Sequence, residues 1–182
     1  MDKQKKRLDI SDMTKAALCA ALLSASSYLV LPLPFTPIVL SLHTIMVNLI
    51  GLVLRPRHAA YTLLVYLLMG LVGLPVFSGG TAGPGKLFGP TGGFYFGFLF
   101  AVIAISFLKG KEPRPLRYTL VTIGVGLPIQ HLFAVLFMCV HNGFHLWAAF
   151  LSVSLPFLPG DILKCVIASL IGAALNRFLP DT

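Results

Sequence analysis

The sequence predicts an all-α polytopic membrane protein with six transmembrane helices. Three observations support this: 57% of the 182 residues are hydrophobic, only 11% are charged, and the apolar residues gather into six stretches of helical length. A soluble domain carries about 25% charged residues. With so few charges, most apolar side chains must face lipid or one another. We therefore expect residues 1–182 to form a single six-helix membrane domain with both termini in the cytoplasm.

The six stretches are separated by prolines, glycines and basic residues. A crossing needs about 20 residues, because a helix rises about 1.5 Å per residue through a hydrocarbon core of about 30 Å. The fifth connection, residues 141–160, is long and partly apolar, and we expect a short interfacial helix around Trp147. The predicted spans are residues 16–31, 38–54, 59–74, 94–108, 120–140 and 161–178.

The basic residues are distributed unevenly between alternate connections. Twelve of the 14 lysines and arginines lie in the N-terminal segment, in the loops at residues 55–57 and 109–117, and at Arg177. Only Lys86 and Lys164 lie elsewhere. Basic residues favour the cytoplasmic side, so this bias places both termini there. It also accounts for the net charge of +8, and we expect no nucleic-acid partner.

Asp161 and Lys164 are the most informative polar residues. They follow Pro159-Gly160 at the outer start of the sixth span, and their spacing of three places both on one helical face. Ionisable groups at membrane depth are costly and usually face a cavity or a partner. A plain alternative is that Asp161 caps the helix while Lys164 extends outward to water. Because Lys164 runs against the charge bias, a functional pair is the better interpretation.

Three histidines and the three cysteines are weaker indications of a functional site. His141 and His145 have the spacing of helical metal ligands, but Asn142-Gly143 interrupts the helix between them and no third ligand is evident, so we expect no metal site. Gln130 and His131 either line a cavity or bond one helix to another. The three cysteines are scattered and indicate no disulfide framework.

The third connection, residues 73–93, holds eight glycines and three prolines. Glycine permits positive φ and close backbone approach, while proline restricts the chain, so an ordered but irregular path is expected. Its apolar residues argue against a plain flexible loop, and we expect ligand contact. Gly80 to Lys86 matches the phosphate-binding pattern G-x-x-x-x-G-K, but Leu87 stands where Ser or Thr is needed, and no strand precedes it. We expect no ATP site in this chain.

The first predicted helix carries small residues at helical spacing, among them Ala16, Ala17, Ala20 and Ala21. Small residues let helix backbones approach closely in lipid. This face either packs internally or docks a membrane partner.

Three motifs in order resemble the BioY family, the biotin-specific substrate-capture (S) components of energy-coupling factor (ECF) transporters. They are residues 32–37 (PLPFTP), residues 73–94 from GLPVF to GPTGGF, and residues 159–164 (PGDILK). The resemblance covers nearly the whole chain. It implies a six-helix S-component fold in a prokaryotic plasma membrane, a biotin site near the outer surface, and a transmembrane coupling protein with two cytoplasmic ATPases as partners. ATP then binds to those ATPases, and this chain needs no cofactor.

The resemblance also implies roles for individual residues. Asp161 is the expected acceptor for the ureido N–H groups of biotin, and Lys164 the donor to a ureido or carboxylate oxygen. The first helix is similar to the family's docking face, with Ala16, Ala17, Ala20 and Ala21. Where the family usually has Thr-Leu-Gln, this chain has Ser41-Leu42-His43. The other expected ligand-binding residues are Phe35, Thr36, His43, Phe77, Gly79, Gly80, Thr81, Phe88, Gly89, Pro90, Thr91, Gly92 and Tyr95.

Two other functions stay open at this point. One is an S component for a different vitamin. The other, from a different class, is a small membrane enzyme that uses Asp161 and Lys164. An enzyme is not expected, because no pair of carboxylates and no nucleophile–base pattern is evident.

Overall fold

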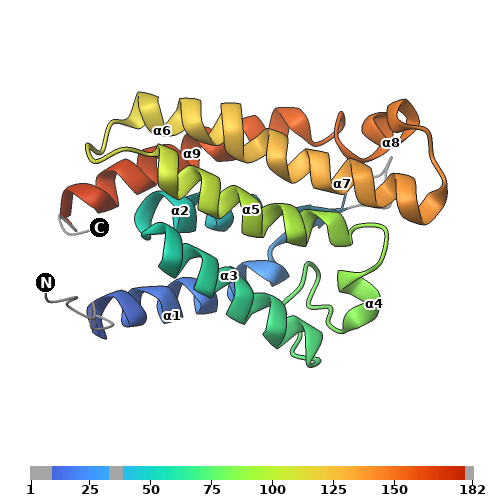
Figure 1. Cartoon of the computed structure of the whole chain (residues 1–182), viewed down its shortest axis with the longest axis horizontal. Helices are drawn as coiled ribbons and strands as arrows, with labels where there is room; N and C mark the ends of the chain where they lie inside the picture. Colours follow the sequence, from blue (N-terminus) through green and yellow to red (C-terminus); the bar gives the residue numbers. More distant parts are fainter. Residues whose placement is uncertain (1–9, 33–38, 179–182) are drawn as a thin grey trace, which may run out of the picture.

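The structure is a computed structural model that describes residues 10–32 and 39–178 (Figure 1). Most of the described chain is helical. In chain order the elements are α1 (Ile10–Ala25), η1 (Ser26–Tyr28), β1 (Val30–Pro32), β2 (Val39–Ser41), α2 (His43–Val53), α3 (Pro56–Leu71), α4 (Pro84–Leu87), α5 (Gly92–Leu108), α6 (Pro115–Val121), η2 (Thr122–Gly126), α7 (Leu127–Asn142), α8 (Leu146–Val153) and α9 (Leu158–Phe178).

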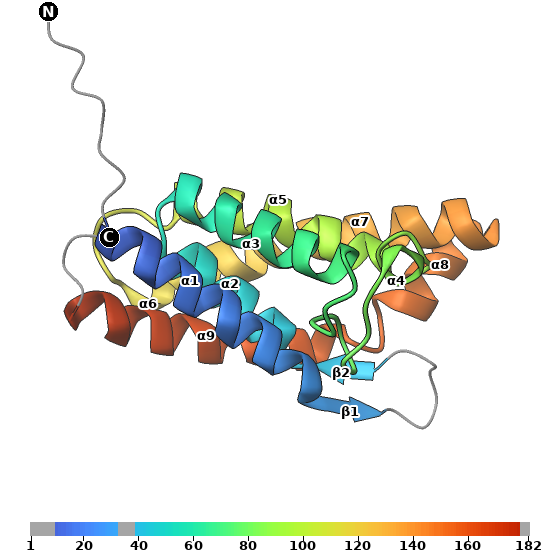
Figure 2. The same ribbon diagram turned by 90° about the horizontal axis from the view of Figure 1, so that it is seen from below.

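The helices form an elongated bundle in which α5 is central. It packs against α2, α3 and α7, while α9 lies along α2 and α6, and α1 lies along α3 (Figures 1 and 2). The segments α6, η2 and α7 run on as one long helix, with a π-helical turn at η2. Within the described residues, two helices are long and apolar enough to cross a bilayer alone, Pro115–Asn142 and Leu158–Phe178. The short helix predicted around Trp147 is present as α8, and its interfacial position stays a prediction.

A two-stranded hairpin replaces parts of the first two predicted spans. Helix α1 ends at Ala25, and Val30–Pro32 pairs antiparallel with Val39–Ser41, so that Val30 faces Ser41. The second helix accordingly begins at His43 rather than at residue 38. The prediction of a mainly helical fold is confirmed, and these two short strands are a local departure from it. The physical reason is the run of prolines between residues 32 and 37, since proline cannot continue a helix and leaves the chain extended.

The two ends of the bundle differ in character. The start of α1, the α2–α3 connection, the α5–α6 loop and the end of α9 lie at one end (Figure 1). At this end Asp12 lies 3.9 Å from Arg55 and 3.7 Å from His58, which ties α1 to the start of α3. The hairpin, α4 and α8 lie at the opposite end (Figure 2). The basic connections are therefore separated from the glycine-rich connection by the length of the bundle.

The glycine-rich connection is ordered by backbone hydrogen bonds. The N–H of Gly79 donates to the carbonyl of Ser27 at 2.8 Å, and the N–H of Gly83 donates to that of Gly70 at 2.7 Å. Both glycines have positive φ, +76° and +90°, which other residues rarely adopt. The ring of Phe77 is fully buried against Gly70, where an added Cβ would lie 2.1 Å from the ring. The loop is thereby fixed to both η1 and α3.

Candidate ligand-binding site

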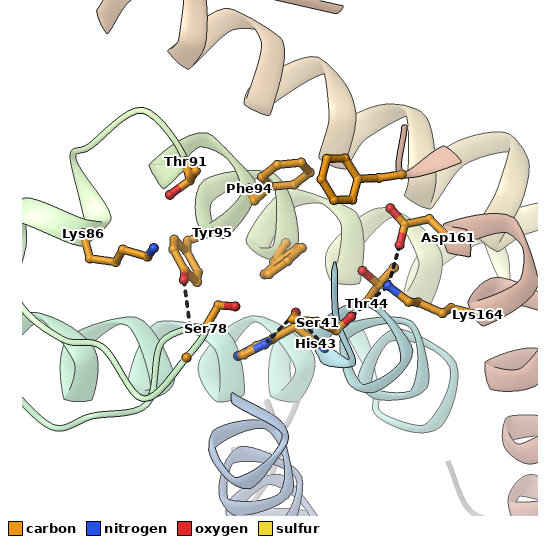
Figure 3. A pocket seen from close by; sticks show the side chains of 13 residues that line it. Ser41, His43, Thr44, Ser78, Lys86, Thr91, Phe94, Tyr95, Asp161 and Lys164 are labelled. Atoms are coloured by element: carbon orange, nitrogen blue, oxygen red, sulfur yellow. Dashed lines mark hydrogen bonds and ion pairs between the residues drawn. The ribbon is translucent and has the colours of Figure 1, made fainter. Parts of the chain in front are cut away.

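A cavity of about 210 Å³ lies at the end of the bundle that carries the glycine-rich connection (Figure 3). Four parts of the chain enclose it: the β2–α2 junction, the glycine-rich connection, the first turns of α5, and the start of α9. The lining residues are Ser41, His43, Thr44, Ser78, Gly79, Lys86, Thr91, Phe94, Tyr95, Phe98, Phe157, Asp161 and Lys164.

Asp161 and Lys164 form a buried ion pair on one wall of this cavity. Each residue is only 6% exposed, and Lys164 Nζ lies 2.9 Å from Asp161 Oδ1. The same ammonium donates to the backbone carbonyl of Ser41 at 2.8 Å, which joins α9 to the β2–α2 junction. The i, i+3 spacing thus produces the contact that the sequence predicts. Lys164 does not extend outward to water.

The pair keeps hydrogen-bonding capacity for a ligand. An ammonium has three donors, and Lys164 uses two of them on described residues. An ionised carboxylate has about four acceptor positions. Asp161 receives Lys164 at one oxygen, and His131 Nε2 lies 3.3 Å from the other. The wall therefore presents acceptor positions and a donor side by side.

His43 is held by a hydrogen-bond relay. Ser41 Oγ lies 3.0 Å from His43 Nδ1, and His43 Nε2 lies 2.9 Å from the hydroxyl of Tyr66. Because that hydroxyl donates to the carbonyl of Val76 at 3.0 Å, it must accept from Nε2–H of His43. The imidazole lines the cavity, but both of its nitrogens are already used: Nδ1 contacts β2, and Nε2 connects α2 to α3 and, through Tyr66, to the glycine-rich connection.

Aromatic rings form the middle of the cavity. Phe94, Tyr95 and Phe98 come from one end of α5, and Phe157 comes from the turn before α9. The hydroxyl of Tyr95 accepts from the N–H of Ser78 at 3.0 Å, which holds the loop against α5. Lys86 lies across the cavity from Asp161 and Lys164, as Figure 3 shows. The cavity thus has two polar ends and an apolar middle.

The structure brings together part of the predicted set. Asp161, Lys164, His43 and Tyr95 line the cavity, as do two residues of the glycine-rich connection, Gly79 and Thr91. Phe35 and Thr36 lie outside the described residues.

The remaining predicted residues of the connection do not line the cavity. Phe77 is buried beneath the loop against Tyr66 and Tyr95, so it supports the cavity from behind. Phe88 is 52% exposed, its ring lies near Phe96, and it does not line this cavity, so its contact with the ligand stays a prediction. Gly80, Gly89 and Pro90 lie in the turns of the loop, Thr81 forms a backbone bridge with Phe77, and Gly92 begins α5.

Several lining residues were missed by sequence reasoning. Phe94 and Phe98 flank Tyr95 on one helical face, and their i, i+4 spacing was an available signal. Lys86 stands out in the sequence as an exception to the charge bias and as the lysine of the G-x-x-x-x-G-K pattern, and a lone cation on the outer side was itself a signal. Thr44, Ser78 and Phe157 carry no distinguishing pattern.

The BioY family model matches residues 1–181. The chain is 35% identical to "Biotin transporter BioY2" of Lactococcus lactis over 93% of this chain and 92% of that protein. It is 30% identical to "Biotin transporter BioY" of Rhizobium etli, with 90% and 91% covered.

A solved structure shares the fold. It is described as the S-component for biotin from an ECF-type ABC transporter, and it superposes with a TM-score of 0.85 over 97% of this chain and 95% of that chain. Sequence identity to it is 23%. The matched family model, the full-length relatives and the three ordered motifs agree, and the chain belongs to the BioY family.

Proposed function

We propose that this chain captures biotin for uptake, as the substrate-binding S component of an ATP-driven ECF vitamin transporter. The observation that supports this most directly is the buried pair of Asp161 and Lys164 on the cavity wall. A ureido group presents one carbonyl acceptor between two N–H donors. A carboxylate beside an ammonium is complementary to that pattern, because the carboxylate accepts the N–H groups and the ammonium donates to the carbonyl.

The rest of the cavity supports a defined orientation for biotin. Phe94, Tyr95 and Phe98 provide an apolar surface for the fused ring and the aliphatic chain. Lys86, at the far polar end, is the cation for the terminal carboxylate. Lys164 then serves the ureido oxygen, since it is already engaged with Asp161 and with Ser41 at the other end. His43 supports the site through its hydrogen bonds to Ser41 and Tyr66, and the neighbouring residues contact the ligand.

The proposal includes a membrane arrangement of six crossings with both termini in the cytoplasm. The basic connections and the described ends of α1 and α9 share one end of the bundle, which suits the cytoplasmic side. The cavity then faces the outer surface. Helices α1, α2, α3 and α5 are shorter than the 20 residues of an upright crossing, and the extended segments and caps beside them complete the path.

The proposed partners are a transmembrane coupling protein and two cytoplasmic ATPases, which supply the energy. The coupling protein docks on α1, where Ala17 and Ala21 are exposed. Ala20 is buried and Ala16 packs against the core, so the predicted alanine face divides into an inner and an outer half. Two of the four alanines therefore pack inside the bundle, and the other two are available for docking.

Calorimetric titration of the purified chain in detergent with biotin, thiamine and riboflavin tests the proposal. We expect binding of biotin alone. Binding of another vitamin in its place would indicate a different S component. The relatives are named as transporters, which favours transport over catalysis. Chromatographic recovery of unaltered biotin after incubation is therefore expected, and a modified product would favour the enzyme.

A further inference from the structure

The carboxylate of Asp161 is held at both of its oxygens. Lys164, from the same helix, reaches Oδ1 at 2.9 Å, while His131, from α7, places Nε2 3.3 Å from Oδ2. All three residues are buried. Because an ionised carboxylate only accepts hydrogen bonds, this contact assigns a proton to Nε2 of His131. The ion pair on α9 is thus extended to a third residue on a different helix.

The imidazole of His131 is oriented by its neighbours. Its ring meets Phe94 edge to face, with centroids 5.7 Å apart. Its Nδ1 is buried and has no hydrogen-bond partner among residues 10–32 and 39–178. The contacts with the ring of Phe94 and with the oxygen of Asp161 therefore both favour this ring orientation. Since Phe94 lines the cavity, His131 joins two of its walls from behind.

Two glycines on α5 set the distance at which α7 presents His131. A Cβ on Gly93 would lie 2.3 Å from the carbonyl oxygen of Phe133, and one on Gly97 would lie 3.0 Å from that of Gln130. Gln130 and Phe133 flank His131 along α7. Close backbone approach through small residues is a general means of helix packing in membranes. Here the close contact between α5 and α7 fixes the position of α7, which carries His131.

We infer that His131 is a positioning residue, which orients the Asp161 carboxylate so that its remaining acceptor positions face the ligand. His131 is not among the residues that line the cavity, so it acts through Asp161. The terminal torsion of an aspartate is broad when nothing holds it. With His131 on Oδ2 and Lys164 on Oδ1, that torsion is fixed before the ligand arrives. This inference rests on the proposed function, since the ligand group concerned is the ureido N–H of biotin.

The alternative is that His131 only fastens α7 to α9. The fastening and the positioning role predict different effects of a shorter hydrogen-bond donor at residue 131. His131→Gln retains an N–H donor at about the reach of Nε2, whereas His131→Asn carries the same amide on a side chain one methylene shorter. Both variants keep a polar group between the helices. A simple fastening role predicts that any loss of biotin affinity is accompanied by a lower unfolding temperature without biotin, whereas a positioning role predicts a loss of affinity for the Asn variant at an unchanged unfolding temperature.

Calorimetric titration with biotin tests the inference. We expect His131→Asn and His131→Ala to weaken binding about tenfold, the size of one lost hydrogen bond to a charged group, and His131→Gln to stay within about threefold of the unaltered chain. In an Asp161→Asn background, His131→Ala should have little further effect, since residues acting through one another are not additive. His141→Ala, at the exposed end of the same helix, is the matched control.

Two results would overturn the positioning role: equal affinities for the Gln and Asn variants, or an undiminished effect of His131→Ala in the Asp161→Asn background. Thermal unfolding without biotin identifies any variant that is misfolded, and the Gln and Asn pair decides the question if the Ala variant is. Failure of the unaltered chain to bind biotin is a separate outcome, which would overturn the proposed function.

Discussion

Asp161→Asn is the most direct perturbation of the proposed site. The substitution keeps the size of the side chain and removes its charge. In the structure the carboxylate receives Lys164 at 2.9 Å, and in the proposed complex it also accepts ureido N–H groups. A hydrogen bond to a charged group contributes about 1.5 to 3 kcal/mol. Since about 1.4 kcal/mol corresponds to a factor of ten, the loss of one such bond weakens biotin binding about 10-fold to 150-fold.

The same substitution has a second expected effect, on stability. Lys164 is 6% exposed and loses its ionised partner, and breaking a buried ion pair costs about 3 to 5 kcal/mol. Thermal unfolding in detergent should therefore occur at a lower temperature. Because reduced stability alone can lower the fraction of protein that binds, affinity is measured well below the unfolding transition, where the calorimetric stoichiometry reports the folded fraction.

Lys164→Ala completes the test from the other side of the pair. It removes the proposed donor to the ureido oxygen, and we expect at least a tenfold loss of biotin affinity. Leu163→Ala is the matched control, because Leu163 is exposed on the same turn of α9. If Asp161→Asn and Lys164→Ala both bind biotin as tightly as the unaltered chain, in folded protein, the assignment of this site is refuted.

Three further predictions concern the far end of the cavity, the α5–α7 contact and the partner surface. Lys86→Met should weaken binding of biotin about tenfold and leave that of biotin methyl ester unchanged, since the ester lacks the charge that Lys86 is proposed to meet. Calorimetry that finds an equal loss for both ligands would contradict this. Gly97→Leu should lower the unfolding temperature and weaken biotin binding, because overpacking costs about 1 to 3 kcal/mol and the added Cβ meets the backbone of Gln130. Gly85→Ala is the control, because a Cβ added at Gly85 meets nothing within 4 Å. An equal effect of the two substitutions would count against the reasoning. Ala21→Leu should retain biotin binding and lose co-purification with the coupling protein, because Ala21 is exposed on α1; retained co-purification would remove α1 as the docking surface.

The sequence was informative where the physical constraint is local. Asp161 and Lys164 could be paired from their spacing, because three residues along a helix bring side chains together whatever surrounds them. The ordered character of the glycine-rich connection likewise followed from its own composition. The bilayer constraint acts on whole segments, so the helical stretches were readable from hydropathy.

What could not be predicted depends on contacts between distant segments. His131 meets Asp161 because α5 brings α7 to a particular distance, and nothing near residue 131 encodes that distance. Phe88 was assigned to the ligand because it is apolar, but the turn before α5 points its ring outward. The hairpin was missed because its pairing joins residues on both sides of the proline segment, and hydropathy alone does not distinguish a short strand from the end of a helix.

The attachment of the glycine-rich connection to the end of α1 has a thermodynamic consequence. The N–H of Gly79 donates to the carbonyl of Ser27, and the hydroxyl of Tyr28 donates to the carbonyl of Pro75 at 3.0 Å, so the glycine-rich connection, which covers the cavity, is joined to η1 directly after α1. If a partner binds along α1 and shifts that end, it changes the free energy of the cover. Linkage then makes the effect reciprocal: the factor by which the partner alters affinity for the vitamin is the factor by which the vitamin alters affinity for the partner. A single titration, partner against chain with and without biotin, would measure that coupling.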